Sequence, residues 1–297
     1  MAPNSIRRLT ETHVGNWTRT THGNLSLAIG FAASLLTAGC GDNESAYLDP
    51  APAVSMFNAQ ALKNPAGTVL IIYNHDSLAE DAPDRCQPKG DTTPDVIRDL
   101  VGKRVGGKLI AVYAFCTPSK VGAFNDKYRE GEPKVVKRTK DIEFLLRNIH
   151  KSGMPPQNIF LAGQGAGAWA PLLVARRGHV AFNSVIAFAP RFTGPKKGRS
   201  DGWTRVLREH EQFITRTPEI NGLVFAFQND PYVMTRDLRF LRSVKGINLV
   251  GLPSKAINQV PCNRGKPHLT AFDECFRKTQ LQRIIAFMSQ RIFAGNL

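Results

Sequence analysis

Long apolar runs and internal repeats are scarce in this sequence, and each scarcity excludes a class of protein. The apolar stretch near the N-terminus, residues 25–38, is shorter than the roughly 20 residues that a membrane-spanning helix needs. No repeat of about 20 to 50 residues recurs, and the composition is neither collagen-like nor coiled-coil. Hydrophobic residues nevertheless make up 42% of the 297 positions, enough to bury a sizeable core. The length fits one large domain or two small ones.

Acidic residues are also scarce, since 24 Asp and Glu stand against 39 Lys and Arg, a net charge of +15. Removal of residues 1–39 takes away three Arg and one Glu, a net +2, and leaves 15 − 2 = +13. The basic residues are scattered, without aromatic interleaving or a nucleic-acid motif, so we expect no nucleic-acid partner. A positive body favours anionic lipid headgroups; a generally basic soluble protein is the alternative. We expect no metal and no cofactor.

The N-terminal segment has the layout of an export signal. Residues 1–24 are polar and carry three arginines, residues 25–38 are apolar, and small residues precede Cys40. The run Leu-Thr-Ala-Gly-Cys at 36–40 resembles a bacterial lipobox, whose cysteine is acylated and becomes the mature N-terminus. The resemblance implies a lipoprotein of the bacterial cell envelope, periplasmic or on the outer-membrane side, held by lipid on Cys40. An ordinary secretory signal with an incidental cysteine is the alternative.

Four cysteines follow Cys40, an even number that suggests two disulfides in an exported chain. Three connectivities are possible, and we favour the neighbour pairs Cys86–Cys116 and Cys262–Cys275. Four unpaired buried thiols are the alternative.

After a polar tether expected over residues 40–65, strands and helices alternate through residues 66–297. Continuous apolar runs, typical of strands buried on both faces, are followed by helix-spaced segments. The expected strands are 68–73, 108–115, 158–162, 184–189, 223–227 and 247–250, and the expected helices are 94–101, 141–150, 166–177, 236–244 and 278–293. This alternation predicts an α/β domain with a mainly parallel central sheet flanked by helices on both faces. Segments 124–140 and 191–217 carry no motif and are candidates for a lid.

Sites in parallel sheets lie at the carboxyl ends of the strands, and reactive residue types follow four of the expected strands. Asn-His-Asp-Ser at 74–77 follows the first, a glycine-framed turn at 163–167 the third, Asp230 the fifth, and a loop with His268 the sixth. In this order the chain resembles the α/β-hydrolase superfamily, in its esterase and dienelactone-hydrolase-like branch, across residues 66–295. The resemblance implies that Asp230 orients His268 and that His268 serves as the base.

The same resemblance assigns donors for a developing oxyanion. The backbone N–H of Ala166 matches one oxyanion donor, and that of Asp76 or Ser77 would supply the other. Gln164, within the glycine-framed turn, is a further candidate for the oxyanion or ligand-binding site. His75 either contacts a ligand or shapes the oxyanion loop.

The attacking position departs from the superfamily's pattern. The superfamily's turn, the nucleophile elbow, reads Gly-x-Ser-x-Gly, whereas Gly165 stands at the serine position here. No Ser, Thr or Cys occurs between Asn158 and Asn183, so a shifted register does not restore a nucleophile. Cys116 also ends a strand, but a disulfide to Cys86 is the better account of it. Glycine suits the strained turn, so we expect the elbow to keep its shape and Gly165→Ser to restore some ester hydrolysis.

Each of these residues also has a purely structural explanation. Asp230 could simply begin a turn, and His268 could be a solvated loop residue. The three glycines could form a phosphate-binding loop, although their spacing departs from Gly-x-Gly-x-x-Gly. Trp169 is expected in the core.

Three functions therefore stay open. One is a lipid-anchored protein of ester or acyl hydrolase ancestry with impaired or lost covalent catalysis, which binds a small ester or acyl ligand. A second is a weakly active hydrolase in which His268 and Asp230 activate water in the space vacated above Gly165. A third is a non-catalytic envelope lipoprotein that acts through its basic surface.

Overall fold

A computed structural model describes residues 46–48, 62–76, 92–116, 127–128, 132–196, 201–263 and 265–294. They belong to one compact unit that runs from Gly41 to Leu297. The strands are β1 (Ala46–Tyr47), β2 (Thr68–Asn74), β3 (Arg104–Val105), β4 (Lys108–Phe115), β5 (Lys127–Tyr128), β6 (Glu132–Pro133), β7 (Ile159–Gln164), β8 (Ser184–Phe188), β9 (Glu219–Phe227), β10 (Lys245–Leu252), β11 (Ala256–Ile257) and β12 (Val260–Pro261). The α-helices are α1 (Asp95–Arg98), α2 (Lys134–Lys151), α3 (Ala166–Arg177), α4 (Asp201–Thr215) and α5 (Glu274–Ala294), and the 3₁₀ helices are η2 (Pro156–Asn158), η3 (Thr235–Ser243) and η4 (Pro267–Phe272).

The central sheet has the order β1-β4-β2-β7-β8-β9-β10, with β3 added beside β4. All neighbours from β4 to β10 are parallel, whereas β1 and β3 pair with β4 in the antiparallel sense. Because parallel strands share one carboxyl edge, the segments after β2, β7 and β9 are brought to the same side of the sheet.

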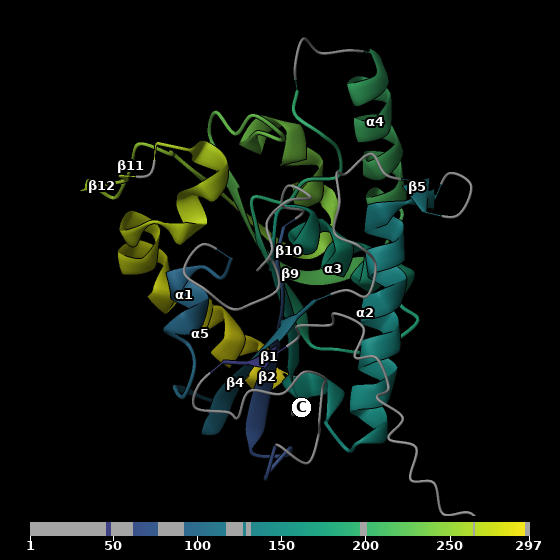
Figure 1. Cartoon of the computed structure of the whole chain (residues 1–297), viewed down its shortest axis with the longest axis vertical. Coiled ribbons are helices and arrows are strands. Elements are labelled where there is room, and N and C mark those ends of the chain that lie inside the picture. The colour runs from purple at the N-terminus through teal and green to yellow at the C-terminus, as the bar shows by residue number, and fades with distance from the viewer. Residues whose placement is uncertain are drawn as a thin grey trace, which may run out of the picture. The chain divides into compact units, whose positions relative to one another are not determined.

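Helices cover both faces of this sheet (Figure 1). Alternate residues of β2 enter two separate cores: Leu70 and Ile72 pack with residues of α2, α3 and α4, and Val69 and Ile71 pack with residues of α1 and α5. All seven residues of β2 are buried, which is why its sequence is a continuous apolar run rather than an alternating one.

The predicted α/β class is confirmed, and the six expected strands are present as β2, β4, β7, β8, β9 and β10. The helix expected over 166–177 has those bounds, and Trp169 is fully buried. The segment expected at 236–244 is a 3₁₀ helix, η3, rather than an α-helix. Residues 201–215, within a segment that carried no motif, form the α-helix α4.

The segment expected to be a tether contributes to the sheet. Within residues 40–65, Ala46 and Tyr47 form β1 and pair with Ala114 and Tyr113 of β4, and the Tyr47 ring packs on that of Tyr113 with centroids 5.0 Å apart. In the part of the chain that the structure describes, no helix combines the length and hydropathy needed to cross a bilayer.

Candidate active site

The turn between β7 and α3 is strained in the manner expected of a nucleophile elbow. Gly165 has φ 59° and ψ −122°, a combination that residues with a Cβ rarely adopt. Its N–H donates to the carbonyl of Phe188, and its carbonyl accepts from the N–H of Arg191, both at 3.0 Å. The turn is therefore fixed against the end of β8.

The two flanking glycines are required by close packing. A Cβ on Gly163 would overlap the carbonyl of Gly167, and a Cβ on Gly167 would overlap the carbonyls of Asn74 and His75. The first turn of α3 thus lies directly against the end of β2. This contact explains the glycine frame without a bound phosphate.

Asp230 and His268 lie in direct contact at the carboxyl edge of the sheet. Asp230, which follows β9, is 1% exposed, and the Nδ1–H of His268 donates to its Oδ2 at 2.8 Å. The other Asp230 oxygen accepts from the N–H of Tyr232 at 2.8 Å, and the Tyr232 ring packs on the imidazole with centroids 4.4 Å apart. The side-chain amide of Gln164 donates to the carbonyl of His268 at 3.1 Å. These hydrogen bonds and the ring contact therefore fix Asp230, His268 and the elbow relative to one another.

A parallel sheet with a strained glycine turn after β7, an acid after β9 and a histidine beyond β10 identifies the architecture. The chain has the α/β-hydrolase fold.

Several solved structures resemble this chain at low sequence identity. A phospholipase/carboxylesterase from Dyadobacter fermentans is 14% identical, with 84% of this chain and 96% of that one covered and a TM-score of 0.46. The Arabidopsis thaliana protein SOBER1 is 14% identical, with 76% and 99% covered and a TM-score of 0.47. The esterase Est2 from Thermogutta terrifontis is 14% identical, with 75% and 83% covered and a TM-score of 0.45. No family model and no curated protein matches the sequence. The strand order and the elbow of the chain itself identify its fold.

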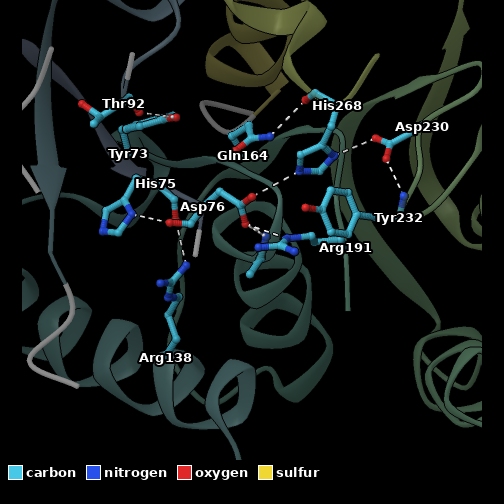
Figure 2. A network of polar contacts seen from close by, with 11 residues as sticks. Tyr73, His75, Asp76, Thr92, Arg138, Gln164, Arg191, Asp230, Tyr232 and His268 are labelled. Atoms are coloured by element: carbon cyan, nitrogen blue, oxygen red, sulfur yellow. Dashed lines mark hydrogen bonds and ion pairs between the residues drawn. The ribbon is translucent and has the colours of Figure 1, made fainter. Parts of the chain in front are cut away.

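In this α/β-hydrolase fold, the space above the elbow is filled by the carboxylate of Asp76 (Figure 2). The N–H of Ala166 donates to Asp76 Oδ1 at 2.8 Å, and Nε of Arg191 donates to the same oxygen at 2.9 Å. The Nε2–H of His268 points at Asp76 Oδ2 across 3.2 Å. A Cβ built on Gly165 would overlap the carboxyl carbon and both oxygens of Asp76. The Asp76 carboxylate and a side chain at position 165 therefore exclude each other.

This position of Asp76 changes the expected role of two parts of the site. The Ala166 N–H, expected as an oxyanion donor, donates to the Asp76 side chain, and the second donor expected from the backbone of Asp76 or Ser77 stays a prediction. The space expected to be vacant above Gly165, in which His268 would activate water, is occupied. Ser77 lies outside the described residues.

His75 faces its own loop rather than a pocket. Its Nδ1 lies 2.5 Å from the carbonyl of Asp76, and its carbonyl accepts from Nη1 of Arg138 at 2.7 Å. Of the two roles weighed for His75, shaping the loop fits these contacts. Arg138, on α2, is 5% exposed and adds a second buried guanidinium beside the Asp76 loop.

The charges of the site are set by mutual pairing. Burial alone would lower the pKa of His268, but its hydrogen bonds to Asp230 and Asp76 raise the pKa from 6.5 to about 9. Burial alone would raise the pKa of Asp76, but Arg191, then His268 and the Ala166 N–H, hold it well below its usual range. Burial lowers the pKa of Arg138 to about 10, against the opposing effect of Asp76. At neutral pH the site thus contains an imidazolium, a carboxylate on each side of it, and two guanidinium groups.

Disulfide bonding agrees with the predicted pattern where the structure describes it. Cys262 and Cys275 are bonded, and the bridge brackets the segment that carries His268. Cys116 is also disulfide-bonded. Cys86 and Cys40 lie outside the described residues, so the Cys86–Cys116 pairing and lipidation stay predictions. Among the residues that the structure describes, no three His, Cys, Asp or Glu side chains are placed to share a metal ion.

Sequence reasoning missed Arg191 and Arg138. Arg191 follows β8 by three residues, so the rule that selected Asp230, inspection of the residues after each strand, would have found it. Arg138 carries no comparable signal, because it reaches the site from the middle of a helix whose neighbours in space the sequence does not reveal.

Proposed function

We propose that this protein is a lipid-anchored α/β-hydrolase-fold protein of ester or acyl hydrolase ancestry that has lost serine-type covalent catalysis. The observation that carries the proposal is the carboxylate of Asp76 above Gly165. It replaces an attacking hydroxyl with a buried group that is already bound on three sides.

Three requirements of acyl transfer are unmet in this geometry. A nucleophile is absent, because Gly165 has no side chain. The base is absent, because His268 with a pKa of about 9 already carries a proton at neutral pH. The oxyanion donor on Ala166 is engaged by Asp76 at 2.8 Å, so it does not stand free to stabilise a developing negative charge.

Water activation by His268 is disfavoured for the same reasons. A general base needs an unprotonated nitrogen within reach of the water. Here Nδ1 is directed at Asp230 and Nε2 at Asp76. We therefore favour a protein whose retained site has a structural or ligand-binding role over a weakly active hydrolase.

The anchor part of the proposal is supported by the sequence alone. The lipobox-like run that ends at Cys40 supports acylation there, and the net charge of +13 expected for the mature chain supports contact with anionic lipid. Metabolic labelling with an alkynyl fatty acid should mark the wild-type chain and fail on Cys40→Ser. Normal processing of Cys40→Ser, with no change in membrane association, would point to an ordinary secretory signal instead.

The catalytic part is tested with a fluorophosphonate probe and p-nitrophenyl butyrate on the purified full-length mature protein. We expect neither labelling nor hydrolysis above that of buffer, and the same from His268→Ala. Labelling that disappears in His268→Ala would refute the proposal. So would turnover of a simple epoxide or haloalkane with a covalent adduct on Asp76, because that carboxylate would then be an active nucleophile.

A further inference from the structure

A cavity of about 530 Å³ lies away from the candidate site, between α2, α3 and α4. Its size falls within the range of small-molecule sites, about 300 to 1,000 Å³. Val136 of α2, Leu173 of α3 and Phe213 of α4 supply its apolar walls. Figure 1 shows these three helices on one face of the sheet. From its lining we propose that this cavity binds a fatty acid, with the hydrocarbon chain between the helices and the carboxylate at Arg176.

A neutral imidazole lines the cavity. The indole N–H of Trp169 donates to Nδ1 of His210 at 3.0 Å, and burial lowers the pKa of His210 to about 4, so the ring is neutral at pH 7. A neutral imidazole that accepts at Nδ1 carries its proton on Nε2. His210 therefore lines the cavity without adding a charge to it.

Arg176 supplies the charge that selects an anion. Its Nε donates to the carbonyl of Phe213 at 2.6 Å, and its guanidinium lies over the Phe213 ring, 4.6 Å from the centroid. These contacts hold the side chain in place and use only one of its five N–H donors. No carboxylate among the described residues is paired with it. A planar guanidinium with free amino groups suits bidentate binding of a carboxylate.

The other charged residues of the lining have oppositely charged neighbours. Arg177 pairs with the buried Glu143 at 3.1 Å, and His179 lies 3.6 Å from the same carboxylate. Glu209, 65% exposed, lies 3.9 Å from Arg205, and water screens its charge. Among the described residues, Arg176 is therefore the charged group of the lining without a charged neighbour, and it lies beside the apolar walls. This combination matches a single anionic head group on an apolar chain better than it matches a neutral lipid or a polyanion.

The cavity is separate from the Asp76 site but connected to it by packing. Trp169, which holds His210, lies four residues after Gly165, and its ring packs on Phe192 with centroids 5.0 Å apart. Phe192 directly follows Arg191, which binds Asp76. Fatty-acid binding in this cavity does not require a catalytic Asp76 site.

The experiment is calorimetric titration of the purified mature protein with octanoate, decanoate and dodecanoate at pH 7.5. We expect the affinity to rise with each added methylene, by up to about fourfold, until the cavity is full. Methyl dodecanoate, which lacks the charge, should bind at least about tenfold more weakly. Arg176→Gln should reduce dodecanoate affinity by a similar factor and leave methyl dodecanoate unchanged. Val136→Trp should abolish binding of both by filling the cavity.

Matched variants keep the result interpretable. Arg239→Gln removes an exposed arginine of η3 outside the cavity lining and should bind like the wild type. Unchanged thermal unfolding shows that Arg176→Gln and Val136→Trp are folded, and His268→Ala tests independence from the Asp76 site. Three outcomes would overturn the proposal: no binding by folded wild type, equal binding of the acid and its methyl ester, or binding that survives both Arg176→Gln and Val136→Trp.

Discussion

The two halves of the candidate site differ in how far they keep the arrangement of an acyl hydrolase. The acid–histidine half keeps it: Asp230 and His268 meet at 2.8 Å, and Gln164 and Tyr232 hold the pair in place. The nucleophile half keeps only the backbone. Its glycine turn has the strained conformation, but a carboxylate from another loop fills the space where the attacking oxygen would stand.

This difference shows that a change in the nucleophile half can change the protonation state of the histidine in the other half, although the position of that histidine is kept. A histidine between an aspartate and a neutral hydroxyl can act as a base. The same histidine between two carboxylates becomes an imidazolium, because both neighbours favour its charged form. Asp76 therefore does more than fill space, since it also converts the expected base into a fixed cation.

The largest effect should come from rebuilding the nucleophile half. Gly165→Ser together with Asp76→Gly removes the carboxylate, supplies the hydroxyl and frees the Ala166 N–H. We expect fluorophosphonate labelling and an increase of about 100-fold or more in p-nitrophenyl butyrate hydrolysis, because the members of a triad act as a unit.

The single variants sharpen this comparison. Gly165→Ser alone, expected from the sequence to restore some activity, should stay inactive because its Cβ meets Asp76. Adding His268→Ala to the double variant should remove the gained activity. A folded double variant without labelling would show that Asp230 and His268 are not competent to activate a serine at position 165.

A smaller but still large effect is expected on stability when Asp76 is truncated. Asp76→Ala leaves Arg191, Arg138 and His268 without their common anion, and breaking a buried ion pair in this way costs about 3 to 5 kcal/mol. Urea unfolding monitored by tryptophan fluorescence measures this loss.

Two further variants serve as comparisons for Asp76→Ala. Asp76→Asn keeps an acceptor for the Ala166 N–H and should lie between wild type and Asp76→Ala. Lys245→Ala removes an ion pair with Glu219 whose lysine side chain is 77% exposed, and it should cost less than about 1 kcal/mol. Equal costs for Asp76→Ala and Lys245→Ala would mean that the Asp76 network adds little to the fold.

The same contrast between the halves explains what the sequence could predict. Strands buried on both faces are visible as continuous apolar runs, and their order brings Asp230 and His268 to one edge although 38 residues separate them. The role of the Asp76 side chain was not visible in the sequence. It depends on how the segment after β2 packs against the turn after β7, and only that packing reveals the overlap with a Cβ at Gly165. The resemblance pointed to the backbone N–H of Asp76 and carried no signal for its side chain.

Two other misses have different causes. The helix α4 has a regular apolar stripe, since Trp203, Val206, Leu207 and Ile214 recur at helical spacing and pack in or against the core. Its periodicity was therefore readable in the sequence, although no motif marked the segment. β1 has two residues, too few for an alternating pattern. Its strand character comes from pairing with β4, which is a tertiary contact.

The smallest predicted effect concerns pH and tests whether His268 is indeed a cation. A histidine whose pKa is raised from 6.5 to about 9 by folding stabilises the protein fully below pH 6.5 and loses that contribution as the pH rises through 9. The loss is at most about 3 kcal/mol. Asp76, whose pKa is lowered by folding, adds stability above its ordinary range near pH 4 and loses it only in stronger acid, so the two contributions overlap between about pH 4 and 6.5. Urea unfolding of wild type and His268→Gln between pH 6 and 9.5 separates this effect from that of the other histidines. The wild type should lose stability relative to His268→Gln across that interval. Parallel curves would show that folding leaves the pKa of His268 unshifted, and a relative gain in stability with rising pH would show that the fold keeps the imidazole neutral; either result would contradict a fixed cation at His268.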